Sequence, residues 1–83
     1  MRILVVEDDV ELNRQLVAAL EDASYVVDKA YDGEEGHYLG DTETYGAVIL
    51  DIRLREKDGL TVREEWSESG RTMTVLMLTA RDR

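Results

Sequence analysis

The alternation of apolar and amphipathic segments in this sequence predicts an α/β fold built on a parallel β-sheet. Four short apolar runs have the composition of strands that are buried on both faces, and three helical segments separate them. Helices that connect successive strands make right-handed crossovers, and such crossovers place the strands parallel to one another. The predicted order is therefore β-α-β-α-β-α-β, in one domain because the chain has only 83 residues.

The first predicted strand is followed by a capped helix. Residues 3–6 form a continuous apolar run that ends abruptly at the acidic residues Glu7, Asp8 and Asp9. Asp9 can accept a hydrogen bond from the first backbone amides of a helix that continues to about Ala23. The apolar positions of this helix recur at a spacing of three or four residues: Leu12, Leu16, Val17 and Leu20.

The rest of the chain repeats this pattern with weaker helices. The remaining predicted strands are residues 25–27, 47–50 and 75–78, and the last two end at Asp51 and at Thr79-Ala80. The remaining predicted helices begin at Asp32-Gly33 and at Gly59, and they continue to about Glu43 and Ser67. Gly36 and Gly40 lower the helix propensity of the second helix, whereas Trp66 in the third predicts an anchor in a core or an interface. His37 is expected to be a surface residue of the second helix.

The composition limits the classes of partner and compartment. The net charge is −9, and residues 1–50 account for all of it, with twelve acidic and three basic residues. Such a chain is a poor direct ligand for nucleic acid, because cationic side chains drive the binding of phosphate backbones. The sequence has no cysteine, no signal peptide and no apolar run of the roughly 18 residues that a membrane span needs. We therefore expect a cytoplasmic protein without a membrane anchor.

Carboxylates follow two of the predicted strands at the edge where ligands bind in open α/β sheets. Glu7 and Asp8 follow the first strand, and Asp51 ends the third. If these two strands are neighbours, the three carboxylates converge, and their mutual repulsion is relieved by a hard divalent cation such as Mg²⁺. A carboxylate beside bound Mg²⁺ is also a nucleophile for phosphorus. Thr79, which follows the fourth strand, offers a hydroxyl that can donate a hydrogen bond to a phosphoryl group.

Three segments resemble the receiver domains of two-component response regulators, most closely those of the OmpR type. The similar segments are Val5-Val6-Glu7-Asp8-Asp9, the run from Val48 to Leu54 with Asp58-Gly59, and the run from Val75 to Ala80. They resemble the acidic motif of the first strand, the phosphoacceptor strand with its loop, and the switch-threonine strand. The resemblance covers essentially all 83 residues, in the family's order and spacing.

The resemblance implies a flavodoxin-like parallel sheet and a phosphoacceptor module of two-component signalling, rather than an enzyme. Asp51 would be the phosphoacceptor, with Thr79 hydrogen-bonded to the phosphoryl group. Asp8 would bind Mg²⁺ directly and Glu7 through water. Asp51 and the backbone carbonyl of Arg53 would complete the protein ligands. The implied phosphodonor is a histidine kinase, with at most weak self-phosphorylation from small phosphodonors. No organic cofactor is implied.

The sequence departs from the family pattern in length and in a few residues. We expect residues 1–83 to be a truncated receiver domain, without the last helix-strand-helix of the family and without an effector domain. Arg55 stands where the family usually has proline, and Lys57 and Arg63 stand where it is usually apolar, Arg63 at a position expected to face the sheet. Without the last helix-strand-helix, at least one face or edge of the sheet would be left uncovered. This predicts that the sheet is completed by self-association, as a homodimer.

A different class of function stays open beside the phosphoacceptor module. The chain could be a fragment or an engineered scaffold that assembles with itself and has no signalling activity, and the absence of proline and the added charges favour engineering. A nucleotide-binding or dehalogenase-like enzyme is a poorer interpretation. The sequence contains neither GxGxxG nor GxxxxGK[ST], and Arg53 stands two residues after Asp51.

Overall fold

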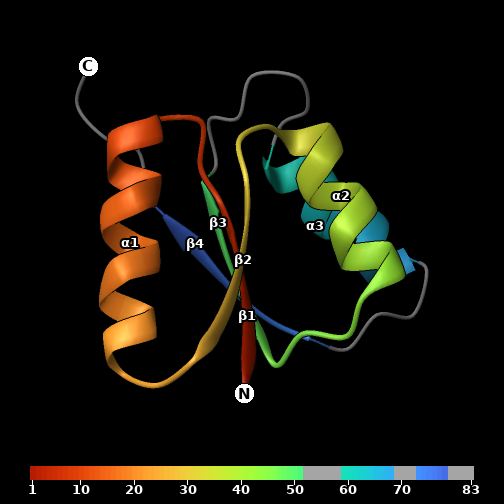
Figure 1. The fold of residues 1–83 in the computed structure, drawn as a ribbon. Helices are drawn as coiled ribbons and strands as arrows, with labels where there is room; N and C mark the ends of the chain where they lie inside the picture. The colour runs from red at the N-terminus through yellow and green to blue at the C-terminus, as the bar shows by residue number, and fades with distance from the viewer. Residues whose placement is uncertain (52–58, 69–72, 79–83) are drawn as a thin grey trace.

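The computed structural model describes residues 1–51, 59–68 and 73–78, which form a sheet between two layers of helix (Figure 1). The strands are β1 (Arg2–Val6), β2 (Val26–Ala30), β3 (Ala47–Asp51) and β4 (Thr74–Leu78). The helices are α1 (Val10–Asp22), α2 (Gly33–Thr42) and α3 (Gly59–Glu68). The predicted alternation of strands and helices is confirmed. None of the helices in this described part of the chain has both the length and the apolar character to span a membrane.

All strand pairs are parallel, and the strand order is β2-β1-β3-β4. The chain moves from β1 to β2 in one direction and then returns past β1 to β3 and β4. Because the crossovers are right-handed, this reversal puts α1 on one face of the sheet and α2 with α3 on the other, as Figure 1 shows. The topological switch point therefore lies between β1 and β3. These are the two strands whose ends carry the carboxylates, so the condition for their convergence is met.

The core lies between the sheet and the layer of α2 and α3. Its buried members are Leu4, Val6, Ala30, Tyr45, Val48, Leu50, Val62 and Trp66. Trp66 is the anchor of this cluster, as its sequence position predicts, and its indole packs where α2 has no side chain, at Gly40. The prediction that His37 lies on the surface is only partly right, because its half-buried ring stacks on Trp66 with a centroid separation of 6.2 Å.

The strand β2 is longer than predicted, because it continues to Ala30 instead of ending at Val27. The polar residue Asp28 is tolerated inside this edge strand because it is hydrogen-bonded. Its Oδ2 accepts from the Arg2 guanidinium at 2.8 Å and from the Tyr45 hydroxyl at 2.7 Å. Burial and this bond to the Asp28 carboxylate raise the pKa of Tyr45. The network ties β1, β2 and the start of β3 together at the end of the sheet opposite the carboxylates.

Replacing Gly40 by alanine is expected to destabilise the chain although alanine is the better helix former. The added Cβ would meet the Trp66 ring, including Nε1 at 2.7 Å, so one of the two helices must move. Such overpacking costs about 1–3 kcal/mol, which exceeds the gain in helix propensity of about 1 kcal/mol. The free energy of unfolding in urea measures the effect. Tyr38→Ala, an exposed position of the same helix, is the control and should change the free energy by less than about 0.5 kcal/mol.

Candidate metal centre and nucleophile

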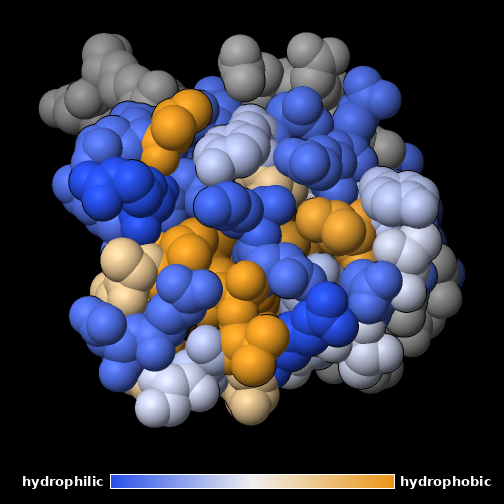
Figure 2. All heavy atoms as spheres, viewed as in Figure 1, coloured by the Kyte–Doolittle hydropathy of each residue, from blue (hydrophilic) through white to orange (hydrophobic). Residues whose placement is uncertain are grey.

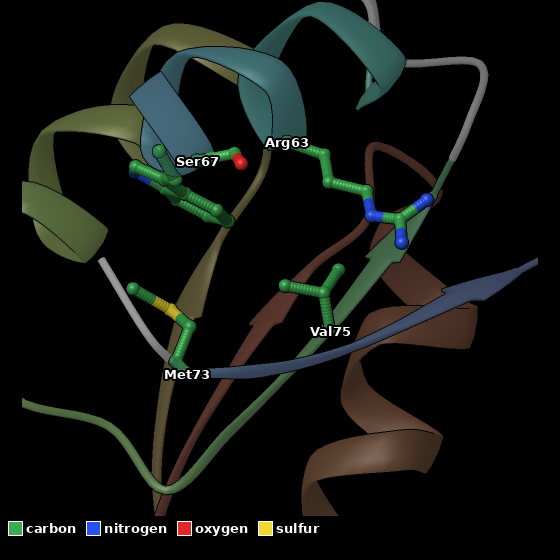
Figure 3. A pocket seen from close by; sticks show the side chains of 5 residues that line it. Arg63, Ser67, Met73 and Val75 are labelled. Atoms are coloured by element: carbon green, nitrogen blue, oxygen red, sulfur yellow. The ribbon is translucent and has the colours of Figure 1, made fainter. Parts of the chain in front are cut away.

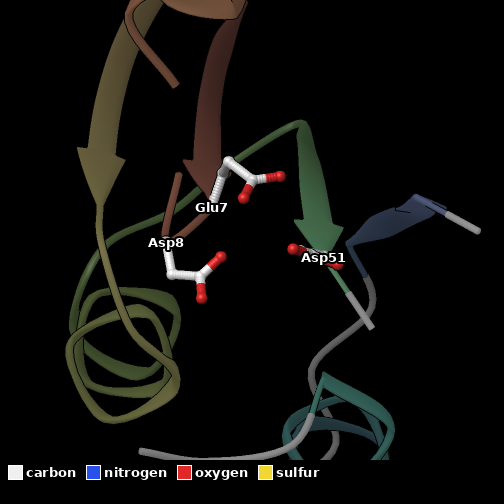
Figure 4. A group of neighbouring side chains, drawn as sticks. All are labelled: Glu7, Asp8 and Asp51. Carbon is white, nitrogen blue, oxygen red and sulfur yellow. The ribbon is translucent and has the colours of Figure 1, made fainter. Parts of the chain in front are cut away.

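Three carboxylates meet at the carboxyl ends of β1 and β3. One oxygen each from Glu7, Asp8 and Asp51 lies within 4.8 Å of the other two. Figure 4 shows the Glu7 and Asp8 side chains extending from the end of β1 toward the tip of β3, where Asp51 points back at them. The sheet register explains this meeting, because Val6 is paired with Leu50 and the chain continues from each into the acidic residues.

Glu7 is a fully buried carboxylate, and hydrogen bonds with backbone groups of neighbouring residues set its orientation. Its backbone N–H donates to the Ala30 carbonyl at 3.1 Å, which extends the β1–β2 pairing past the end of the strand. Its Oε2 accepts from the backbone N–H of Asp9 at 2.9 Å. The side chain is therefore folded over the turn between β1 and α1.

The two aspartates that follow Glu7 have different tasks. Asp8 is half-buried and belongs to the carboxylate cluster. Asp9 is exposed and caps α1, as predicted, because its Oδ1 accepts from the Leu12 N–H at 3.1 Å. Asp8 is therefore part of the carboxylate cluster, whereas its neighbour Asp9 caps the helix.

The cluster is electrostatically costly without a counter-charge. Asp51 is 1% exposed at the end of β3, and Glu7 is fully buried, so water screens their charges weakly. Two unit charges about 5 Å apart repel by about 3 kcal/mol at an effective dielectric constant of about 20. A bound cation or protonation would relieve this repulsion.

The donor set fits Mg²⁺. Carboxylate oxygens are the ligands this ion prefers, at about 2.0–2.1 Å, so two ligand oxygens on one ion lie at most about 4.2 Å apart. The spacing within 4.8 Å is close enough for small side-chain rotations, or one bridging water, to bring the oxygens around a single ion. Mg²⁺ characteristically keeps several waters, and that leaves room for a phosphoryl oxygen.

Two of the predicted site residues lie outside the described residues. They are Arg53, predicted to bind metal through its carbonyl, and Thr79, predicted to contact the phosphoryl group. Arg55 and Lys57 lie outside them as well. The structure therefore brings together three of the predicted site residues, and the roles of all five remain predictions.

A separate hollow of about 200 Å³ lies between α3 and β4 (Figure 3). Its lining residues are Arg63, Trp66, Ser67, Met73 and Val75. The sequence predicts that Arg63 faces the sheet. Its side chain extends over the hollow toward β4 and helps to line it, yet the residue is exposed. Long cationic side chains commonly combine an apolar stem on the protein surface with a charged end in water. Among the described residues that line this hollow none is a carboxylate, so we do not associate it with the metal centre.

Asn13 is a buried polar residue beside the cluster that the sequence-based predictions miss. It lies on the inner face of α1, four residues after the cap Asp9. The sequence carries one signal of it, a polar residue in the stripe of apolar positions between Leu12 and Leu16.

The response regulator receiver domain family matches residues 3–83 of the chain. The transcriptional regulatory protein CiaR of Streptococcus pneumoniae is 39% identical over 99% of this chain and 36% of its own length. The virulence transcriptional regulatory protein PhoP of Salmonella typhimurium is 38% identical over 99% of this chain and 37% of its own length. The chain thus spans little more than a third of these curated relatives.

Solved structures show the same fold. The response regulator TrrA of Thermotoga maritima, in complex with Mg²⁺ and BeF, has a TM-score of 0.90 and 34% identity, over 96% of this chain and 70% of TrrA. A structure of TrrA with the histidine kinase ThkA has a TM-score of 0.87 and 33% identity, over 99% of this chain and 71% of the matched one. With the acidic cluster at the switch point of a β2-β1-β3-β4 sheet, these matches establish that the chain belongs to the response regulator receiver domain family.

Proposed function

We propose that the chain is a phosphoacceptor module in which Asp51 receives a phosphoryl group in a reaction that requires Mg²⁺. The observation that carries the proposal is the cluster of Glu7, Asp8 and Asp51 at the carboxyl edge of the sheet. Asp51 is the proposed nucleophile because it ends β3, the strand that faces the cluster from across the switch point. Bound Mg²⁺ would neutralise charge on the carboxylates and on the incoming phosphoryl group.

In the phosphoryl transfer the protein forms only one covalent bond. A carboxylate oxygen of Asp51 forms a bond to phosphorus while the bond from phosphorus to the donor breaks, and the departing group takes that electron pair. The broken bond is P–N for a phosphohistidine and P–O for an acyl phosphate. In this proposal Glu7 and Asp8 would hold the cation, Arg53 would offer a backbone carbonyl to it, and Thr79 would donate a hydrogen bond to the transferred group.

The proposed donor is a histidine kinase, since TrrA, a relative of this fold, was solved with the kinase ThkA. Small acyl phosphates are proposed as weaker donors, so the chain is a substrate that promotes its own modification rather than a turnover enzyme. The net charge of −9 favours a protein partner over nucleic acid. We also propose a cytoplasmic location.

Self-association is a second proposal, because both edge strands of the described sheet expose apolar side chains. Val26 on β2 is 62% exposed, and Leu76 on β4 is 56% exposed. Figure 2 shows apolar atoms gathered between the hydrophilic surfaces of α1 and α2, over β2. Unpaired parallel edges of this kind can pair with another chain. The alternative function, a self-assembling scaffold without signalling activity, would use the same two edge strands. Such a scaffold could be a natural fragment or an engineered protein.

The first prediction concerns covalent modification. After incubation with acetyl phosphate and Mg²⁺, intact-mass measurement should show one added phosphoryl group on the wild-type chain. The gain should disappear in Asp51→Asn, which keeps the shape of the side chain but loses the nucleophilic charge, and when EDTA replaces Mg²⁺. Modification of the folded Asp51→Asn variant at the wild-type level would exclude Asp51 as the acceptor.

The second prediction separates two adjacent aspartates. Asp8→Asn should weaken Mg²⁺ binding by about tenfold or more, because it removes one charged ligand from a small cation site. Asp9→Asn should change it by less than about twofold, because asparagine caps helices as well as aspartate does. Isothermal titration of each variant with MgCl₂ gives the comparison. Equal losses in the two variants would show that general negative charge, rather than the cluster, attracts the ion.

The third prediction concerns assembly. If the edges pair with a second copy, sedimentation velocity should show a dimer whose dissociation constant rises when Val26 or Leu76 is replaced by lysine, the residue that natural edge strands use against pairing. Tyr38→Lys, an exposed site on α2, is the matched control. A folded wild-type monomer across the concentration range would contradict the self-association proposal.

A further inference from the structure

Asn13 is the fully buried residue of α1. The helix lies against β1 and β2, and its apolar positions Leu12, Leu16, Val17 and Leu20 are half-buried. A fully buried amide among these apolar positions is unexpected on packing grounds. It occupies the first turn of the helix, directly after the loop that carries Glu7 and Asp8. A buried amide at this position can donate hydrogen bonds that an apolar side chain cannot.

The amide group of Asn13 joins the ends of two strands. Its Nδ2 donates to the Glu7 carbonyl and to the Ala30 carbonyl, each at 3.0 Å. The Ala30 carbonyl also accepts from the Glu7 N–H at 3.1 Å. Both backbone groups of Glu7 are therefore held, its N–H by the end of β2 and its carbonyl by α1.

The oxygen atom of the same amide group is energetically unfavourable. Its Oδ1 is buried and has no hydrogen-bond partner among the residues that the structure describes. A buried polar atom left in this state costs about 1–3 kcal/mol. A leucine of similar size would avoid that cost, so the contribution of Asn13 must come from its two donated bonds.

The two hydrogen bonds donated by Asn13 restrain the backbone that determines where the Glu7 and Asp8 carboxylates point. The Glu7 carbonyl belongs to the peptide unit that leads into Asp8, so anchoring it limits rotation of the backbone between the two acidic residues. The Glu7 side chain is held separately by the Asp9 N–H at 2.9 Å. The backbone position is thus fixed by Asn13, and the side-chain direction by the turn.

We infer that Asn13 is a positioning residue for the metal centre, which it serves by holding the Glu7–Asp8 backbone in the geometry that binds Mg²⁺. The inference rests on the proposed function, since it assumes that the carboxylate cluster binds the ion. It concerns a side chain that does not contact the ion itself. Groups that orient metal ligands from outside the coordination sphere typically change metal affinity by about 10–100-fold when they are removed.

The test compares Asn13→Leu with a variant that weakens the fold elsewhere. Leu39→Ala is the control, because Leu39 packs against the core from α2, the helix on the opposite face of the sheet from α1. Mg²⁺ affinity is measured by isothermal titration under conditions where urea unfolding shows both variants to be folded. Amide hydrogen exchange at Glu7 and Asp9, in Mg²⁺-free buffer, reports directly on the order of the loop. The rate of modification by acetyl phosphate is then followed as a function of Mg²⁺ concentration.

Asn13→Leu should weaken Mg²⁺ binding by about tenfold or more, speed exchange at the Glu7 amide, and raise the Mg²⁺ concentration needed for half-maximal modification. The rate at saturating Mg²⁺ should stay near that of the wild type, because Asp51 is untouched. Leu39→Ala should leave Mg²⁺ affinity within about twofold of the wild type, since its effect is on global stability.

Two results would overturn the inference, and they can be told apart. Wild-type Mg²⁺ affinity in Asn13→Leu, or an equal loss in Leu39→Ala, would make Asn13 a structural residue only and would leave the proposed function standing. Failure of the wild-type chain itself to bind Mg²⁺ would remove the proposed function and this inference together.

Discussion

The repulsion among Glu7, Asp8 and Asp51 is the constraint on which the rest of the structure depends. Parallel strands bring their carboxyl ends to one edge, and the register of β1 with β3 puts the acidic residues of both within 4.8 Å. Burial of Glu7 and Asp51 strengthens the repulsion, because little water screens them. The fold therefore holds charge in a state that a divalent cation stabilises, and a phosphoryl group can then approach carboxylates whose charge is partly neutralised.

Holding like charges together requires a rigid frame, and the described residues supply it from three sides. The β1–β3 pairing is anchored by the core around Leu4, Val6 and Leu50. The cap of α1 by Asp9 fixes the turn after Glu7. Asn13 links that turn to the end of β2. The cap and the Asn13 bonds each involve a backbone group near the cluster, so positioning does not rely on flexible side chains alone.

Much of this frame could be predicted from the sequence, because it follows from local patterns. Continuous apolar runs predict the strands, and the acidic residues after two of them indicate the site if β1 and β3 are neighbours, which they are. The cap Asp9 also follows from a local rule. The family resemblance points to the same residues, and the match over residues 3–83 supports it.

The features that were missed depend on contacts between distant residues. The extension of β2 past Val27 requires Arg2 and Tyr45 to hold Asp28, and no local pattern reveals that pairing. The half-buried position of His37 arises because Gly40 lets Trp66 approach α2. Asn13 looks like an interruption of an apolar stripe until the carbonyls that it bonds are placed beside it.

The most direct test of the account is the free energy of unfolding of the wild-type chain in urea, measured at pH 7 against Mg²⁺ concentration at constant ionic strength. If the folded state holds carboxylates that a cation stabilises, the free energy should rise with the logarithm of Mg²⁺ concentration, with the slope for one ion per folded chain. A free energy that is the same in Mg²⁺ as in EDTA would contradict the account, because the cluster would then have no need of a cation.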